Sequence, residues 1–393
     1  MAERREALLL DVSGALYPGG GGGIGRYIRD LVAALQSAPG APFARFAYSR
    51  NLRARAGDLA GRDRLVELPF PNRVNMLLAM AAARLGWNLE PVYGRPAVFH
   101  SPNGAGPALP GSRLLLTIHD LTFLDHPEWH TTRNTAFMRA TVPAVAPRAD
   151  LVVCDSDFVR RQVVERLGVA EERTITVPLA VDDVFRPVPE ETAREHLARR
   201  FGLEQPFVLH VGSIEPRKNH LRLVEAFETV RRRGLDVLLV LVGSGGWRNA
   251  HILERLEGSS AAASIRRLSG VADPDLAALY SACAAFAMPS LEEGFGLPLA
   301  EAMACGAACV VADNSSLAEI GGDAAVLIPA EDAAALAAAL FDLCGDAATH
   351  ASVRARGLAR SRLYRREIWS GRMMEIYRGL MDARVGFTRS IAQ

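Results

Sequence analysis

Two carboxylates, Glu293 and Glu301, bracket the turn "GFGLP", and the segment "PLAEAMAC" that follows has a proline and a glycine placed to begin and end a short helix. The amides of Phe295, Gly296 and Leu297 then form a helix N-terminus, which favours an anion. The carboxylates cannot bind that anion themselves, because like charges repel. They would accept hydrogen bonds from hydroxyls on either side of it, as the sugar and the ribose of a nucleotide sugar provide. Alternatively, both acids only complement the helix dipole.

A second anion-binding element is predicted at "VGSIEPRKNHLRLVEAF", where a loop joins a strand to a helix. Arg217 and Lys218 lie on this loop just ahead of the helix. The guanidinium is a fork and the ammonium a point charge, and together they suit a diphosphate. The alternative is an ordinary solvated loop with surface charges.

Five consecutive glycines, Gly19 to Gly23, lie between the first predicted strand and a helix expected to begin near Ile24. Gly22 and Gly23 would let the backbone approach a phosphate closely at a helix N-terminus. The run also matches G-x-G-x-x-G, but the next strand lacks the terminal acid that a dinucleotide-binding fold needs. A surface loop without a ligand is the alternative.

His119 ends an apolar strand and is followed by Asp120, at the edge where parallel sheets bind ligands. A neutral imidazole there could hydrogen-bond a sugar hydroxyl, and a structural role is the alternative. The histidines and cysteines show no metal-ligand spacing, so we expect neither a metal nor a cofactor.

The elements that position these residues alternate between strands and helices, which is typical of doubly wound parallel sheets in an α/β protein. The chain has 393 residues, which favours two domains. Strands are predicted over 7–12, 45–49, 97–101, 113–120, 150–156 and 174–178, and again over 206–212, 235–243, 264–270, 284–290, 307–313 and 324–329. A polar, proline-containing linker separates the two series, so we expect domains over 1–185 and 186–366.

Composition excludes several classes of protein. The 45 basic and 44 acidic residues nearly cancel, so nucleic acid is not an expected partner. Five cysteines without a CxxC pair fit reduced thiols in a cytoplasmic protein. No stretch is long enough to span a membrane. Basic clusters over 198–200, 231–233 and 354–366 leave open peripheral association with the inner membrane surface.

Taken together, the chain resembles the family 4 glycosyltransferases, retaining enzymes of the GT-B fold with two Rossmann-like domains facing a cleft. The resemblance runs through "GGGIGRY", "IHDL", "CDSDFVRR", "VGSIEPRKNH", "LVGSGG" and "SGVADPDLAALYSACAAFAMPSLEEGFGLPLAEAMACG". The last stretch carries the E-x7-E motif of the family as Glu293 and Glu301. Within the family, the chain looks most like bacterial mannosyl- or rhamnosyltransferases of polysaccharide synthesis.

The resemblance implies roles for individual residues. Glu301 would hold the ribose hydroxyls, and Glu293 and His119 would contact the donor sugar. Arg217 and Lys218 would neutralise the diphosphate, and these two cations with Glu293 and His119 are the implied catalytic residues. The other implied donor-binding residues are Gly22, Gly23, Ser213, Val271, Phe295, Gly296 and Leu297. A helix over 367–393 would pack back on the first domain. The segment "PLAVDD" departs from the family pattern and supports no site.

The implied activity is metal-independent, retaining transfer of a hexose, mannose or similar, from a nucleotide-diphosphate sugar, with GDP favoured over UDP. The acceptor would be a glycan or a lipid-linked glycan. Alternatives on the same fold are a nucleotide-sugar 2-epimerase and an enzyme like glycogen or sucrose synthase. A non-catalytic nucleotide-sugar sensor and a nicotinamide-dependent oxidoreductase are alternatives of other classes.

Overall fold

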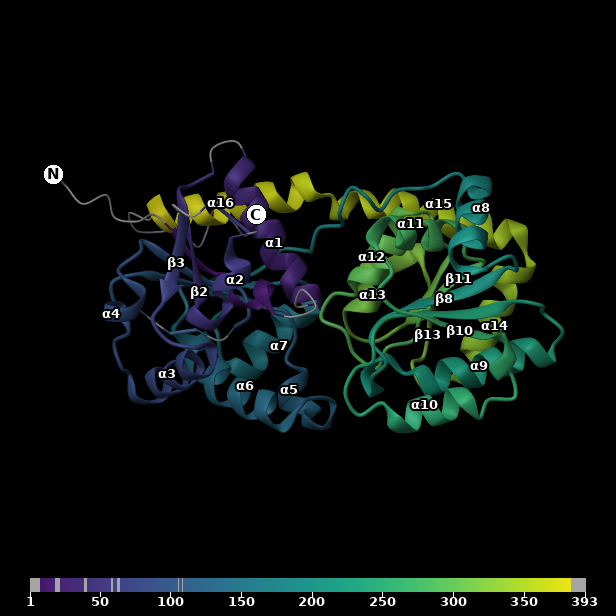
Figure 1. The fold of residues 1–393 in the computed structure, drawn as a ribbon, viewed down its shortest axis with the longest axis horizontal. Helices are drawn as coiled ribbons and strands as arrows, with labels where there is room; N and C mark the ends of the chain where they lie inside the picture. The colour runs from purple at the N-terminus through teal and green to yellow at the C-terminus, as the bar shows by residue number, and fades with distance from the viewer. Residues whose placement is uncertain are drawn as a thin grey trace. The chain divides into compact units, whose positions relative to one another are not determined.

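The computed structural model describes residues 8–17, 22–38, 41–57, 59–61, 64–104, 106–107 and 109–382, without the side chain of Ala83. These residues form two compact units (Figure 1). Unit 1 contains the described residues up to Leu179 together with those from Glu367 onward, and unit 2 contains Ala180–Arg366.

Unit 1 is built on a parallel sheet in the order β3-β2-β1-β4-β5-β6-β7. The six strands predicted for this part of the chain all form. The strands are β1 (Leu8–Asp11), β2 (Ala44–Ser49), β3 (Leu65–Leu68), β4 (Val98–Ser101), β5 (Arg113–Ile118), β6 (Leu151–Cys154) and β7 (Thr174–Thr176). The prediction missed β3, a four-residue edge strand whose first three side chains are only half-buried. Its sequence therefore lacks the apolar run of a central strand.

Helices pack on this sheet around a core of buried aliphatic and aromatic side chains from β1, β4, β5 and β6. They are α1 (Gly22–Ser37), α2 (Arg53–Ala56), α3 (Asn72–Leu85), α4 (Glu90–Tyr93), α5 (Thr122–Asp125), α6 (Thr132–Val145), α7 (Asp157–Leu167) and α16 (Arg366–Asp382). The α16 helix joins unit 1 through buried contacts. Tyr377 hydrogen-bonds His100, and the ring of Trp369 meets that of Tyr27 edge-on at 5.7 Å.

Unit 2 repeats the pattern with the strand order β10-β9-β8-β11-β12-β13, and all six strands were predicted. The strands are β8 (Phe207–Val211), β9 (Leu238–Val242), β10 (Ile265–Leu268), β11 (Ala285–Met288), β12 (Cys309–Ala312) and β13 (Val326–Ile328). The helices are α8 (Glu190–Phe201), α9 (His220–Arg232), α10 (Ala250–Glu257), α11 (Asp273–Ala282), α12 (Leu297–Ala304), α13 (Ser315–Gly321), α14 (Ala333–Gly345) and α15 (Ala347–Ser361).

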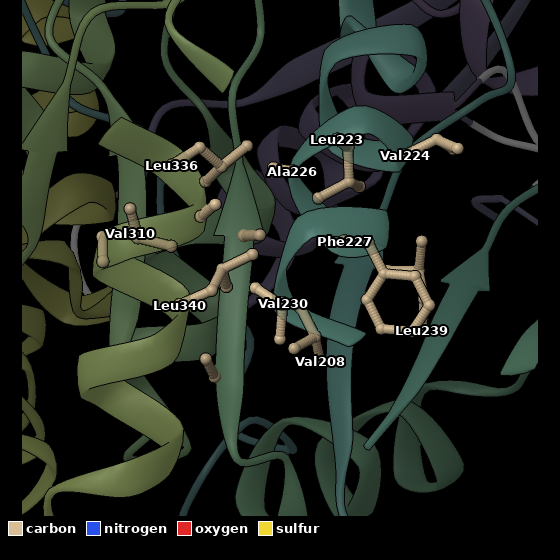
Figure 2. Close-up of a cluster of buried hydrophobic side chains, with 14 of the residues drawn as sticks. Val208, Leu223, Val224, Ala226, Phe227, Val230, Leu239, Val310, Leu336 and Leu340 are labelled. Carbon is tan, nitrogen blue, oxygen red and sulfur yellow. The ribbon is translucent and has the colours of Figure 1, made fainter. Parts of the chain in front are cut away.

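The core of unit 2 explains why α9 forms where it does. Leu223, Phe227 and Val230 recur at helical spacing on α9 and are fully buried. Figure 2 shows them over Val208 of β8 and beside Leu340 of α14. This packing fixes the N-terminus of α9, and with it the loop that carries the predicted cations. In the part of the chain that the structure describes, no helix is long and apolar enough to cross a membrane.

Candidate active site

Both sheets reverse their strand order at one point, between β1 and β4 in unit 1 and between β8 and β11 in unit 2. Ligands of doubly wound sheets bind outside the carboxyl ends of the strands at such a point. In unit 2, Arg217 and Lys218 follow β8, and Glu293 follows β11. The strand order therefore brings these three predicted residues together.

The centre of this cluster in unit 2 is a carboxylate held by two cations. Arg217 Nη1 donates to Glu293 Oε2 and Lys218 Nζ donates to Glu293 Oε1, both at 2.6 Å. Arg217 also pairs with Glu215, whose Oε1 lies 3.2 Å from Nη2. Glu293 is only 5% exposed, and Lys218 and Glu215 are also buried. The two predicted diphosphate-binding cations thus have carboxylate partners in the folded protein.

This pairing controls the protonation of the cluster. Burial alone would raise the pKa of Glu293, but the charges of Arg217 and Lys218 outweigh it and lower the pKa to about 2. Burial also lowers the pKa of Lys218, and the carboxylate of Glu293 partly offsets this effect. Glu293 is therefore ionised at neutral pH.

The backbone around Glu293 is equally well held. Its N–H donates to Ser315 Oγ at 3.1 Å, and its carbonyl accepts from Ser316 Oγ at 2.8 Å. Both serines belong to α13. The loop therefore presents the carboxylate from a rigid backbone.

The predicted helix after the turn is α12, which begins at Leu297, one residue earlier than expected. Its N-cap Gly296 has φ +91°, and a Cβ there would lie 2.5 Å from a methyl of Leu317, so only glycine fits. Among the described residues, the amides of Phe295, Gly296 and Leu297 donate to no other group. They are the free N–H groups that a helix N-terminus offers to an anion.

Glu301 lies inside α12 and is buried, 4% exposed. The hydroxyl of Tyr280, on α11, donates to its Oε2 at 3.0 Å. Tyr280 is fully buried against the ring of Phe286 on β11, so this donor is fixed in place. Sequence reasoning missed Tyr280, because nothing in the spacing of "ALYSAC" relates it to a carboxylate on another helix.

Ser213 and Val271, the other residues predicted to bind the donor, follow β8 and β10 at the same edge of the sheet. Both are partly exposed. A Cβ on Gly243 would lie 2.0 Å from the carbonyl oxygen of Gly212, so the loops after β8 and β9 can approach only because a glycine stands there.

In unit 1, His119 lies at the end of β5 with both ring nitrogens occupied. Nδ1 faces Asp155 Oδ2 at 2.6 Å, and Nε2 faces the carbonyl of Pro102 at 2.9 Å. When Asp155 is ionised, both partners are acceptors and a ring that donates from both nitrogens is an imidazolium, but burial also raises the pKa of Asp155. Burial would lower the pKa of His119, but the charge of Asp155 raises it overall.

The sequence suggests a neutral imidazole that hydrogen-bonds a sugar hydroxyl, and in the structure both ring nitrogens of His119 already have protein partners. Asp155 was not predicted as a partner of His119. The sequence did carry a signal for it, because Asp155 follows β6, the strand that pairs with β5. His119 also meets the ring of Tyr27 edge-on at 4.9 Å. Beneath it, His100 bonds Tyr377 and Thr117, and burial lowers its pKa to about 3, so His100 is neutral.

The glycine loop is only partly described, since Gly19 to Gly21 lie outside the described residues. Helix α1 begins at Gly22, two residues before the expected start at Ile24. Gly22 has φ +58°, and apart from chain neighbours no atom of the described residues lies within 4 Å of a Cβ built on Gly22 or Gly23. Among the described side chains, no group of three His, Cys, Asp or Glu residues could hold a metal ion.

Two Rossmann-like units, one of which carries paired cations and free helix amides at its switch point, are typical of enzymes that use a phosphate-bearing donor. Residues 21–185 match the family described as "Glycosyltransferase Family 4", and residues 205–346 match "Glycosyl transferases group 1". The O-antigen chain mannosyltransferase B of Escherichia coli is 30% identical over 268 residues, which cover 68% of this chain and 70% of that protein. The chain belongs to the family 4 glycosyltransferases.

Other similar proteins agree with this assignment. The phosphatidyl-myo-inositol mannosyltransferase of Mycolicibacterium smegmatis is 30% identical over 58% of this chain and 57% of its own length. The mannosyltransferase WbdA of Escherichia coli is 31% identical over 54% of this chain, which spans only 27% of that longer protein. A sucrose-phosphate synthase from Thermosynechococcus elongatus has the same fold, with a TM-score of 0.74 at 20% identity over 96% of this chain and 99% of that one. The expected GT-B fold is thereby confirmed.

Proposed function

We propose that this glycosyltransferase moves a hexose, mannose or similar, from a nucleotide-diphosphate sugar to a glycan or lipid-linked glycan, with retention of configuration. The observation that carries the proposal is the arrangement of Arg217, Lys218 and Glu293 beside the open amides of α12. Mannose is favoured because the similar curated proteins are named as mannosyltransferases.

The reaction breaks the bond between the anomeric carbon and the diphosphate oxygen, and an acceptor hydroxyl bonds to that carbon. The hydroxyl proton passes to the departing phosphate, so the products are a glycoside and a nucleoside diphosphate. Charge develops on the leaving diphosphate and, with opposite sign, on the sugar. Arg217, Lys218 and the amides of Phe295 to Leu297 would stabilise the diphosphate without reorganising.

The carboxylate of Glu293 would have different partners before and after the donor binds. In the structure it neutralises Arg217 and Lys218, and without it Lys218 would be a buried cation with no ion-pair partner. When the diphosphate arrives, the cations gain phosphate oxygens as partners, and the carboxylate becomes available to accept from hydroxyls of the sugar. Glu301, held by Tyr280, would accept from the ribose hydroxyls.

The remaining parts of the proposal concern the donor and the metal. We expect GDP to be favoured over UDP, with Ser213 and Val271 near the nucleoside and Gly22 and Gly23 near the phosphates. His119 would lie beside the sugar with both ring nitrogens already hydrogen-bonded to the protein. Protein cations replace a divalent ion, so chelation of metals should leave the rate unchanged.

A donor-hydrolysis panel tests the proposal. GDP-, UDP-, dTDP- and ADP-hexoses are incubated with wild-type protein and with Glu293→Gln, and the sugar released is followed by NMR. One donor should be consumed, its own anomer should form first, and the variant should be nearly inactive. Tight binding of a nucleotide sugar with no turnover, even with acceptor glycans, would indicate a sensor. Release of a 2-epimer would indicate an epimerase.

Peripheral association with the inner membrane surface remains part of the proposal, with activity at its cytoplasmic face. Its support is the outer side of α3, where Leu77 is 63% and Val74 38% exposed beside the exposed Arg73 and Arg84. Sedimentation with anionic vesicles at low salt should fall for Leu77→Glu. Equal sedimentation of the variant and the wild-type protein would count against this surface.

A further inference from the structure

A cavity of about 670 Å³ lies in unit 1 at the opposite edge of the sheet from His119. Its walls come from the C-terminal end of α3, the loop before β5, the residues just before β6 and the end of α16. Since β5 runs from Arg113 to Ile118 at about 3.3 Å per residue, the two edges are roughly 20 Å apart. The cavity is therefore separate from the site described above.

The rim of the cavity is held in place by a buried carboxylate. Glu90, 8% exposed, accepts from the N–H of Gly111 through Oε1 at 2.6 Å and from Arg95 Nε through Oε2 at 2.7 Å. The side chain of Asn88 in turn accepts from the N–H of Glu90 at 2.8 Å. A Cβ on Gly111 would lie 2.7 Å from Glu90 Oε1, so the loop packs against this carboxylate too closely for a larger residue. The cavity is preformed.

The lining combines an open aromatic ring with polar groups. Trp87 is 52% exposed, directly after the C-cap of α3. The hydroxyl of Ser112 is shielded from solvent and has no hydrogen-bond partner in the described structure. Arg113 Nη1 donates to Asp150 at 2.7 Å, and the same carboxylate also accepts from the N–H of Leu114. Arg148 is exposed and has no partner among the described residues. The wall thus offers donors, acceptors and one flat apolar face.

We propose that this cavity is a second binding site for a neutral oligosaccharide segment of the glycan, an inference that rests on the proposed glycan acceptor. A pyranose ring has an apolar face for Trp87 and hydroxyls that both donate and accept. Arg148 would donate to a sugar hydroxyl, and Asp150 would accept from one. Ser112 gains its missing partner by a change of rotamer.

The composition of the wall favours a sugar over other ligands. Asp150 already neutralises Arg113, which leaves Arg148 as the single cation of the lining for a phosphate or another anion. Charged side chains on the same wall work against a lipid tail, which would leave them buried without partners.

The cavity contributes to the binding of long acceptors only. A chain that reaches both edges of the sheet needs several sugar units, so a monosaccharide or disaccharide cannot occupy both places at once. A long chain held in the cavity keeps its growing end at a high local concentration near the active site. The KM for long acceptors should therefore depend on the cavity, and the KM for a disaccharide should not.

Binding is tested first, with full-length protein and neutral α-mannooligosaccharides of increasing length, by isothermal titration and saturation-transfer NMR. Trp87→Ala should weaken binding of the longer oligosaccharides about tenfold. Trp247→Ala is the matched control, because Trp247 is 45% exposed but belongs to unit 2. Ser112→Ala removes no protein hydrogen bond and should weaken binding without loss of stability. If no oligosaccharide binds, or Trp87→Ala and Ser112→Ala bind as wild type, the proposal is wrong.

Transfer kinetics separate this inference from the proposed function. Trp87→Ala should raise the KM for long acceptors about tenfold and leave kcat and the KM for a disaccharide acceptor unchanged. Absence of transfer to every acceptor would count against the proposed function, while the binding experiment would still decide on the cavity. Active transfer with the same KM in both tryptophan variants at all acceptor lengths would refute the cavity alone.

Discussion

Replacement of Glu293 by Gln tests the charge cluster of unit 2 directly. The ordinary pKa of this carboxyl is 4.5, and the two cations hold it at about 2. A shift of this size corresponds to roughly 3 kcal/mol of stabilisation of the ionised form, and burial of the group means that solvent screens little of it. Glu293→Gln should lose about this amount at pH 7, because Lys218 is then left buried without its carboxylate.

The dependence on pH follows from the direction of the shift. A carboxyl whose folded pKa is depressed stabilises the protein above its unfolded pKa, and this stability is lost as the pH falls toward the folded pKa. With values of 4.5 and about 2, roughly half of the contribution is gone near pH 3.5. The difference between wild type and Glu293→Gln should therefore shrink on acidification.

Denaturant unfolding of unit 2, followed by amide NMR signals from each unit separately, measures this difference at pH 7 and pH 4. Unit-resolved signals are needed because the two units need not unfold together. Glu331→Gln is the control, since Glu331 is an exposed acid of unit 2. A loss below about 0.5 kcal/mol at pH 7, or a loss that does not change with pH, would refute the reasoning.

Three further predictions concern the parts around the cluster. Gly296→Ala should destabilise unit 2 by about 1–3 kcal/mol and abolish nucleotide binding, measured by denaturation and calorimetry, because its φ of +91° and the leucine methyl beside it exclude a Cβ. Tyr280→Phe should weaken nucleotide binding by about 1 kcal/mol, since Glu301 loses a fixed donor, and unchanged affinity would contradict this role. Asp155→Asn should lower the pKa of His119, which ¹⁵N spectra of the ring would measure. In the wild-type protein, protonated His119 stabilises the fold at pH values below the pKa of His119 in the unfolded chain. This stabilisation is lost as the pH rises through the raised pKa of His119 in the folded protein.

The strands and the turn chemistry could be predicted from sequence because they depend on local patterns. Buried parallel strands appear as apolar runs, and a proline and a glycine mark the ends of α12 within one residue. β3 was missed because Glu67 interrupts a short edge strand that needs little apolar surface. The start of α1 was placed late because Gly22 and Gly23 are poor helix formers, although both lie in the helix.

The pairing of the functional groups could not be predicted, because it depends on strand order. Lys218 and Glu293 are 75 residues apart, and they meet only because β8 and β11 are neighbours at the switch point. His119 and Asp155 meet in the same way across β5 and β6. The sequence predicts a hydroxyl partner for Glu293 and a phosphate for Lys218, but in the folded protein these two residues bind one another. Under the proposed function, donor binding would be an exchange of partners, and its affinity would be the difference between two sets of strong ion pairs.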